Sequence, residues 1–223
     1  MRPRPTMSRM VEPAVLPADL RDGYRRFREG RYATDAERYR SLAESGQRPH
    51  TLVVACSDSR SAPEAVFDAG PGELFVIRNV AGLVPVFAPD ARAHGVSAAL
   101  EYGVVALSVS SIVVLGHGRC GGIAAALEPA GPLTATDFVG AWTTGLRDLA
   151  ATIVMPLTAK PEERRLELER RSVETSIDHL RTFPWIRHRE DDGALGLHGA
   201  WFDIALGELQ VLSTGGWHPV AID

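Results

Sequence analysis

The chain contains little cysteine, no long apolar run and no excess of positive charge, and each absence excludes a class of protein. Only two of its 223 residues are cysteine, too few for a scaffold held together by several disulfide bonds. Lysine and arginine number 24 against 28 aspartate and glutamate, so the net charge of -4 offers no basic surface for nucleic acid. The basic segment 1–6 is not followed by an apolar segment that would form a signal peptide or cross a bilayer. We therefore expect a cytoplasmic protein with reduced thiols, and neither nucleic acid nor a membrane as a partner.

Three short apolar runs predict a parallel β-sheet. Residues 51–55, 74–77 and 112–115 are rich in β-branched side chains and uninterrupted, which is typical of strands that are covered on both faces. Between the second and third runs, residues 94–107 have the apolar spacing and the alanines of a crossover helix. The order of these segments favours an α/β fold with a mostly parallel central sheet flanked by helices.

The flanking segments predict helices before this core and an antiparallel edge after it. Residues 19–42 form a charged helical stretch interrupted at Gly30, either a solvated surface or an arm that wraps a second subunit. From Pro161, apolar residues recur at helical spacing and predict a core-facing helix that Pro184 stops. Residues 197–212 alternate about a turn, which indicates a β-hairpin.

This organisation predicts a single domain over residues 1–223. With 45% hydrophobic and 23% charged residues, the chain has the composition of an ordinary globular domain of this length. Within it, residues 1–45 form the N-terminal helical arm and residues 46–223 form the α/β core that contains the site.

Both cysteines lie in two short motifs that also contain a histidine at metal-ligand spacing. Cys56 follows the first apolar run, and His117 and Cys120 form a short chelating step after the third. Taken alone, a cysteine is usually a small buried apolar residue, and two cysteines could form one disulfide. Two thiolates and one imidazole give Zn²⁺ three protein ligands, the number that a catalytic zinc uses when it keeps a fourth position for water or substrate. We therefore predict one zinc ion per chain.

An acid–base pair stands beside the first ligand. Asp58 and Arg60 follow Cys56 by two and four residues. A loop ion pair is the ordinary role for such residues, but their place next to a metal ligand favours a functional role. Because ligands of open α/β sheets bind at the carboxyl ends of the strands, we expect all five residues to meet there.

These motifs resemble those of the β-class carbonic anhydrases. The resemblance extends from about Leu42 to Leu212. It is carried by ACSDSR at 55–60, PGELFVIRNVA at 71–81 and GHGRCGG at 116–122.

The resemblance implies a zinc enzyme that reversibly hydrates carbon dioxide to bicarbonate and a proton. In the family, the aspartate that matches Asp58 accepts a hydrogen bond from the zinc-bound species and is held by the arginine that matches Arg60. In part of the family this aspartate also binds zinc as a fourth ligand and closes the site, a state open to Asp58 here. Family members assemble as homodimers or tetramers.

Two other functions stay open on the same fold. One is a hydrolase of carbon disulfide or carbonyl sulfide, as in relatives of the family. The other is a non-catalytic zinc- or bicarbonate-binding protein. The intact pair of Asp58 and Arg60 argues against the second, because a purely structural zinc would need neither residue.

Three positions depart from common patterns of the family. Gly70 stands where many members have a glutamine that reaches the neighbouring subunit, and Phe202 stands where a tyrosine serves bicarbonate regulation in some members. Gly82 replaces a frequent asparagine, and we expect it to loosen the backbone there.

Overall fold

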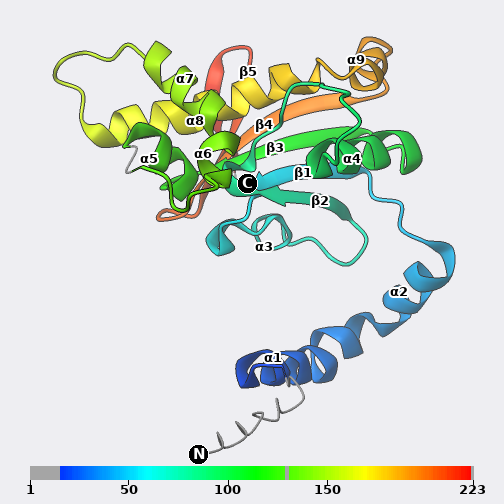
Figure 1. Cartoon of the computed structure of the whole chain (residues 1–223). Coiled ribbons are helices and arrows are strands. Elements are labelled where there is room, and N and C mark those ends of the chain that lie inside the picture. Colours follow the sequence, from blue (N-terminus) through cyan, green and yellow to red (C-terminus); the bar gives the residue numbers. More distant parts are fainter. Residues whose placement is uncertain (1–15, 129–130, 222–223) are drawn as a thin grey trace, which may run out of the picture. The chain divides into compact units, whose positions relative to one another are not determined.

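The computed structural model describes residues 16–128 and 131–221, and the chain divides after Gly46 into two compact units (Figure 1). Of the predicted arm, residues 1–15 lie outside the described residues. No helix in the described part of the chain is both long and apolar enough to cross a membrane. Whether the arm and the core together make one domain stays a prediction.

The first unit is a pair of helices, α1 (Ala18–Glu29) and α2 (Arg31–Ser45), which confirms the predicted helical stretch and its interruption at Gly30. The two helices contact each other through aromatic rings. The ring centroid of Phe27 lies 5.7 Å from that of Tyr32 and 6.0 Å from that of Tyr39. No residue of either helix is buried, so this pair has no core of its own.

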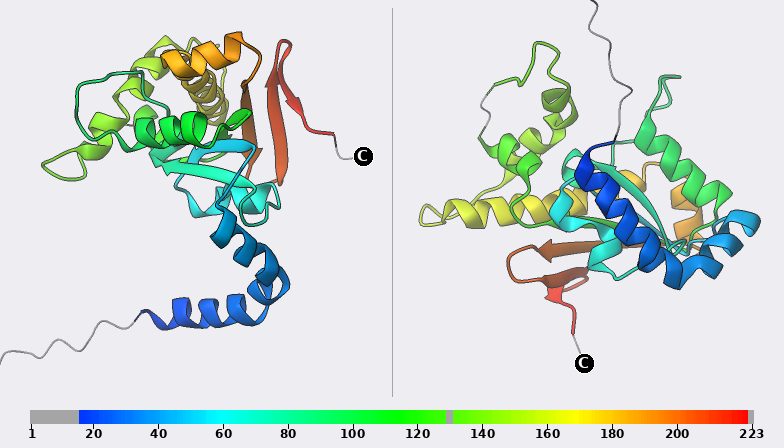
Figure 2. Two further views of the ribbon diagram at one scale, coloured as in Figure 1. Left: turned by 90° about the vertical axis from the view of Figure 1, so that its right-hand side faces the viewer. Right: turned by 90° about the horizontal axis from the view of Figure 1, so that it is seen from below.

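The second unit is built on a six-stranded mixed sheet. Its strands are β1 (Thr51–Cys56), β2 (Leu74–Asn79), β3 (Ser111–His117), β4 (Gly196–Asp203), β5 (Glu208–Ser213) and β6 (Gly216–Pro219), in the order β2-β1-β3-β4-β5-β6. The first four strands in this order pair in parallel, and β4, β5 and β6 pair antiparallel. The predicted fold class is confirmed, including the antiparallel C-terminal edge. That edge appears in red on the right of the left-hand view in Figure 2.

Helices of the second unit connect and cover these strands. They are α3 (Pro63–Val66), α4 (Gly95–Glu101), α5 (Gly121–Leu127), α6 (Phe138–Trp142), α7 (Thr144–Thr152), α8 (Pro161–Leu180) and α9 (Pro184–Asp191). The predicted crossover helix is α4, continued by one wider turn to Ala106. The predicted core-facing helix from Pro161 is α8, which ends at Leu180, before Pro184, and Pro184 is the first residue of the next helix, α9. Proline suits the first position of a helix, because the N–H that proline lacks would have no partner within the helix there.

Side chains of β1 alternate between two apolar clusters, as a strand buried on both faces requires. Leu52 and Val54 pack with the buried residues of α4, α8 and α9, which therefore lie on one face. Val53 and Ala55 join a smaller cluster on the opposite face. In Figure 1, α8 runs along β3 and β4 on the first of these faces. The central strands are therefore packed on both faces. Polar residues gather instead at the carboxyl ends of β1 and β3.

Candidate metal centre

The three predicted metal ligands come together at the carboxyl ends of two neighbouring strands. Cys56 is the last residue of β1, His117 is the last residue of β3, and Cys120 directly precedes α5. All three are buried, and their ligand atoms lie within 4.8 Å of one another. Because β1 and β3 are parallel neighbours, their ends reach the same edge of the sheet.

The geometry of this group fits a tetrahedral zinc ion. The Sγ atoms of Cys56 and Cys120 are 3.9 Å apart, and two zinc–sulfur bonds of 2.3 Å at a tetrahedral angle would place them about 3.8 Å apart. His117 Nδ1 donates to the carbonyl oxygen of Gly118 at 3.0 Å, so in the neutral imidazole Nε2 carries the lone pair that a metal ion would take. That Nε2 is buried and has no hydrogen-bond partner. A buried nitrogen lone pair without a partner costs free energy, and a cation bound between this nitrogen and the two sulfur atoms would remove that cost.

The pKa values of the two thiols are shifted in opposite directions. A hydrogen bond from Cys120 lowers the pKa of Cys56 to about 4, against the effect of burial and with help from His117. The hydrogen bond to Cys56, together with burial, raises the pKa of Cys120 above its usual value. Burial works against protonation of His117, but the neighbouring Cys56 and Gly118 carbonyl raise its pKa overall. A metal ion that binds near neutral pH must therefore displace protons from this group.

Two backbone positions in unusual conformations shape the site. Arg119, directly before Cys120, has a φ of 59°, in the left-handed region that few non-glycine residues adopt. Gly82 has a φ of +65°, and a Cβ there would lie 3.0 Å from the main-chain nitrogen of Cys56. The expectation that Gly82 loosens the backbone is therefore wrong, because glycine lets this turn pack tightly against the end of β1.

Asp58 and Arg60 form a two-point ion pair next to the ligands. Arg60 Nε donates to Asp58 Oδ1 at 2.9 Å and Nη2 donates to Oδ2 at 2.7 Å, while the Arg60 main-chain N–H donates to Oδ1 at 3.0 Å. These hydrogen bonds hold the pKa of Asp58 well below its usual range, so the carboxyl stays ionised. The Asp58 carboxylate does not belong to the group of ligand atoms in this structure. Its role as a fourth ligand in a closed state stays a prediction.

The sequence did not reveal a second arginine that holds the same loop. Arg78, near the end of β2, donates from Nε to the carbonyl oxygen of Cys56 at 3.0 Å and from Nη2 to that of Asp58 at 2.6 Å. Arg60 also reaches the carbonyl oxygen of Arg119 at 3.3 Å. The two guanidinium groups therefore tie together three segments that surround the ligands. The sequence placed Arg78 in the motif at 71–81 and next to the strand end, which predicts proximity but no partner.

A buried glutamate was also missed. Glu169 of α8 is 3% exposed and accepts hydrogen bonds from the main-chain nitrogen of Cys120 and the indole nitrogen of Trp201. A signal for it was present, because Glu169 stands four residues before Val173 in the apolar stripe of the predicted helix. A charged residue at a core-facing position is informative because burying an unpaired charge is costly.

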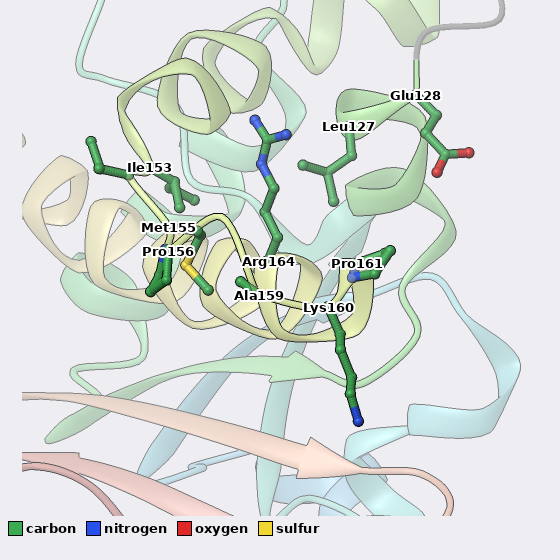
Figure 3. Close-up of a pocket in the computed structure, with 10 residues that line it drawn as sticks. Leu127, Glu128, Ile153, Met155, Pro156, Ala159, Lys160, Pro161 and Arg164 are labelled. Atoms are coloured by element: carbon green, nitrogen blue, oxygen red, sulfur yellow. The ribbon is translucent and has the colours of Figure 1, made fainter.

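A separate surface pocket of about 640 Å³ lies between the end of α5, the connection from α7 to α8 and the start of α8 (Figure 3). In the close-up, Arg164 extends between Leu127 and Ile153, while Lys160 points away from them. None of the five predicted site residues lines this pocket. This pocket is therefore separate from the candidate metal centre.

Comparison with known proteins agrees with this geometry. A family model described as carbonic anhydrase matches residues 51–209. The chain is 37% identical to a carbonic anhydrase of Pseudomonas aeruginosa over 194 residues, which cover 87% of this chain and 86% of that protein. It is 33% identical over 186 residues to the chloroplastic β carbonic anhydrase 5 of Arabidopsis thaliana. That match covers 83% of this chain but spans only 61% of the plant protein.

Solved structures share the fold. The β-carbonic anhydrase CcaA superposes with a TM-score of 0.82 at 30% identity, covering 92% of this chain and 91% of that chain. A structure from a study of two tetrameric β-carbonic anhydrases of Sordaria macrospora superposes with a TM-score of 0.73 at 27% identity. It covers 91% of this chain and 98% of that one.

Proposed function

Because the chain belongs to the β-carbonic anhydrase family, we propose that Cys56, His117 and Cys120 hold one zinc ion and that this site reversibly hydrates carbon dioxide to bicarbonate and a proton. The observation that carries the proposal is the buried, unpartnered Nε2 of His117 facing two thiols, with an ionised carboxylate beside them. Bound zinc would act as a Lewis acid that makes water acidic enough to react near neutral pH.

The protein's own contribution is to orient the reacting water. Asp58 is ionised and keeps 17% of its side-chain surface exposed, so its free carboxylate lone pairs can accept a hydrogen bond from a water molecule at the ligand group. With its pKa held so low by Arg60, Asp58 is too weak a base to keep a proton. Its role is therefore to aim the water, while the proton passes to solvent by another route.

Zinc-replete protein should accelerate carbon dioxide hydration in a stopped-flow assay with a pH indicator. Removal of zinc by a chelator should abolish the acceleration and added zinc should restore it, because the three ligands are the only group of this kind among the described residues. A zinc-replete protein without hydration activity would refute the proposed function. The same preparations assayed with carbonyl sulfide and carbon disulfide distinguish the related hydrolases.

We also propose that the protein works as a homodimer or as a dimer of dimers. The helices α1 and α2 bury none of their residues, and Leu20 and Tyr24 expose 57% and 61% of their surface. A helix pair without a core is not stable alone in water, so we expect a second subunit to bury the exposed apolar side chains of these helices. The relatives from Sordaria macrospora are described as tetrameric. We keep the cytoplasm as the proposed location, because its reducing conditions preserve both thiols for zinc.

Light scattering coupled to size-exclusion chromatography should give a mass of two or four chains of 24.1 kDa. A large interface of the obligate type should keep this mass constant across micromolar concentrations. Replacing the exposed Leu20 and Tyr24 with alanine should shift the mass toward one chain. A fully active wild-type monomer would contradict the proposal.

A further inference from the structure

The long helix α8 places a buried carboxylate against a metal ligand. Glu169 Oε1 accepts from the main-chain N–H of Cys120 at 3.3 Å, and Oε2 accepts from the indole N–H of Trp201 at 3.3 Å. Burial raises the pKa of Glu169, since little solvent reaches the charge. The proposed hydration of carbon dioxide does not use the Glu169 carboxylate, so that reaction does not explain why this group is buried in the core.

A second glutamate–tryptophan pair on α8 shows which of the two contacts of Glu169 accounts for its burial. Five residues further along α8, Glu174 accepts from the indole N–H of Trp217 at 2.9 Å, yet Glu174 is only partly buried. A carboxylate of this helix that binds an indole therefore does not need to be buried. Glu169 differs because its other oxygen reaches Cys120.

The partner of Glu169 also packs against the segment that holds His117. A Cβ on Gly118 would lie 3.2 Å from the ring of Trp201, and one on Gly116 would lie 3.4 Å from it. The residue between this segment and Cys120 is Arg119 in its left-handed conformation. The carboxylate of Glu169 thus fixes both ends of a loop whose backbone is held in an unfavourable conformation.

We propose that Glu169 is a positioning residue of the metal centre. By holding the Cys120 main chain it keeps the two Sγ atoms at the separation that zinc requires, and so it sets the zinc affinity. The proposal rests on the proposed zinc site. Partners of this kind commonly change metal affinity by about 10–100-fold when they are removed.

The test compares Glu169→Gln with the matched control Glu174→Gln. An amide has a single acceptor oxygen, so Glu169→Gln can satisfy only one of the two N–H donors. We expect its zinc dissociation constant, measured by competition with a chromophoric chelator, to rise by about 10–100-fold. In the cobalt-substituted protein, the thiolate-to-cobalt absorption bands should also shift. The control removes the same charge from the same helix and should change neither readout.

Two further variants keep the test decisive if Glu169→Gln does not fold. Glu169→Asp is too short to reach both donors and should also weaken zinc binding. Trp201→Phe removes the indole donor and the part of the ring next to Gly118 but leaves the Cys120 contact, so it should weaken zinc binding less than Glu169→Asp. Wild-type zinc affinity and cobalt spectra in the folded Glu169 variants would overturn the proposal, as would a larger loss in Trp201→Phe.

These readouts are independent of turnover. Wild-type protein that binds zinc but does not hydrate carbon dioxide would refute the proposed function and leave the role of Glu169 standing. Unchanged zinc affinity in the Glu169 variants of an active enzyme would refute the role of Glu169 and leave the proposed function standing.

Discussion

Replacing Cys120 with serine should remove most of the zinc and with it the hydration activity. A serine hydroxyl stays protonated at neutral pH, whereas the thiol can lose its proton to a metal ion. Two of the three ligands would remain, which is too few for a stable protein zinc site. Metal analysis should give about one zinc per chain in the wild type and roughly a tenth of that in Cys120→Ser.

The matched control for this variant is Ser57→Ala. Ser57 follows Cys56 but is exposed and contributes no ligand atom, so the control should keep its full zinc content. Cys56→Ser should behave like Cys120→Ser, since the two Sγ atoms form one pair. Full zinc occupancy in Cys120→Ser would remove this residue from the ligand set.

Replacing Asp58 with asparagine should lower hydration on the order of 100-fold and leave the zinc content unchanged. The amide can no longer offer two anionic oxygens, so neither the reacting water nor Arg60 keeps its partner. In the wild type, activity should rise from neutral to mildly alkaline pH. This rise does not come from Asp58, because its pKa is held far below that range. Loss of one negative charge beside the water should move the midpoint of the rise to lower pH.

Arg60→Ala should also lower hydration, because it frees the Asp58 carboxylate from its ion pair and allows it to act as a fourth ligand. The control is Glu167→Gln, which breaks an exposed ion pair with Arg171 on α8 and should leave the rate profile unchanged. Stopped-flow rates between pH 6.5 and about 9 measure all three variants against the wild type. Near wild-type rates in Asp58→Asn would make Asp58 a bystander.

The sheet and the ligand group were predictable because both depend on local sequence. The runs at 51–55 and 112–115 are buried strands, and the ligands stand directly at or after the ends of β1 and β3. The run at 74–77 also forms a strand, but the expectation that it is covered on both faces is wrong, because β2 lies at the edge of the sheet and is mostly only partly buried. Parallel pairing alone is then enough to bring Cys56 and His117 together. The short helices α6 and α7 were missed, since five and nine residues hold too few turns for a clear period.

The supporting contacts were not predictable for a different reason. Arg78 and Glu169 act through residues 20 or more positions away, so their partners depend on how separate elements pack. The sequence marks Glu169 as unusual within an apolar stripe, but only the crossing of α8 over β3 and β4 identifies Cys120 and Trp201 as its partners. Hydrogen-bond partners of this kind follow from tertiary structure and not from periodicity.

The strand order β2-β1-β3 also determines when the chain can acquire its metal during folding. Cys56 and Cys120 are separated by 64 positions in sequence, and they become neighbours only after β1 and β3 have paired. Parallel pairing through a long crossover is a late, entropically costly event. In a zinc finger the ligands are close in sequence and the metal nucleates the fold. Here the complete ligand set exists only in chains whose central strands are already assembled, so zinc uptake would report that β1 and β3 have paired.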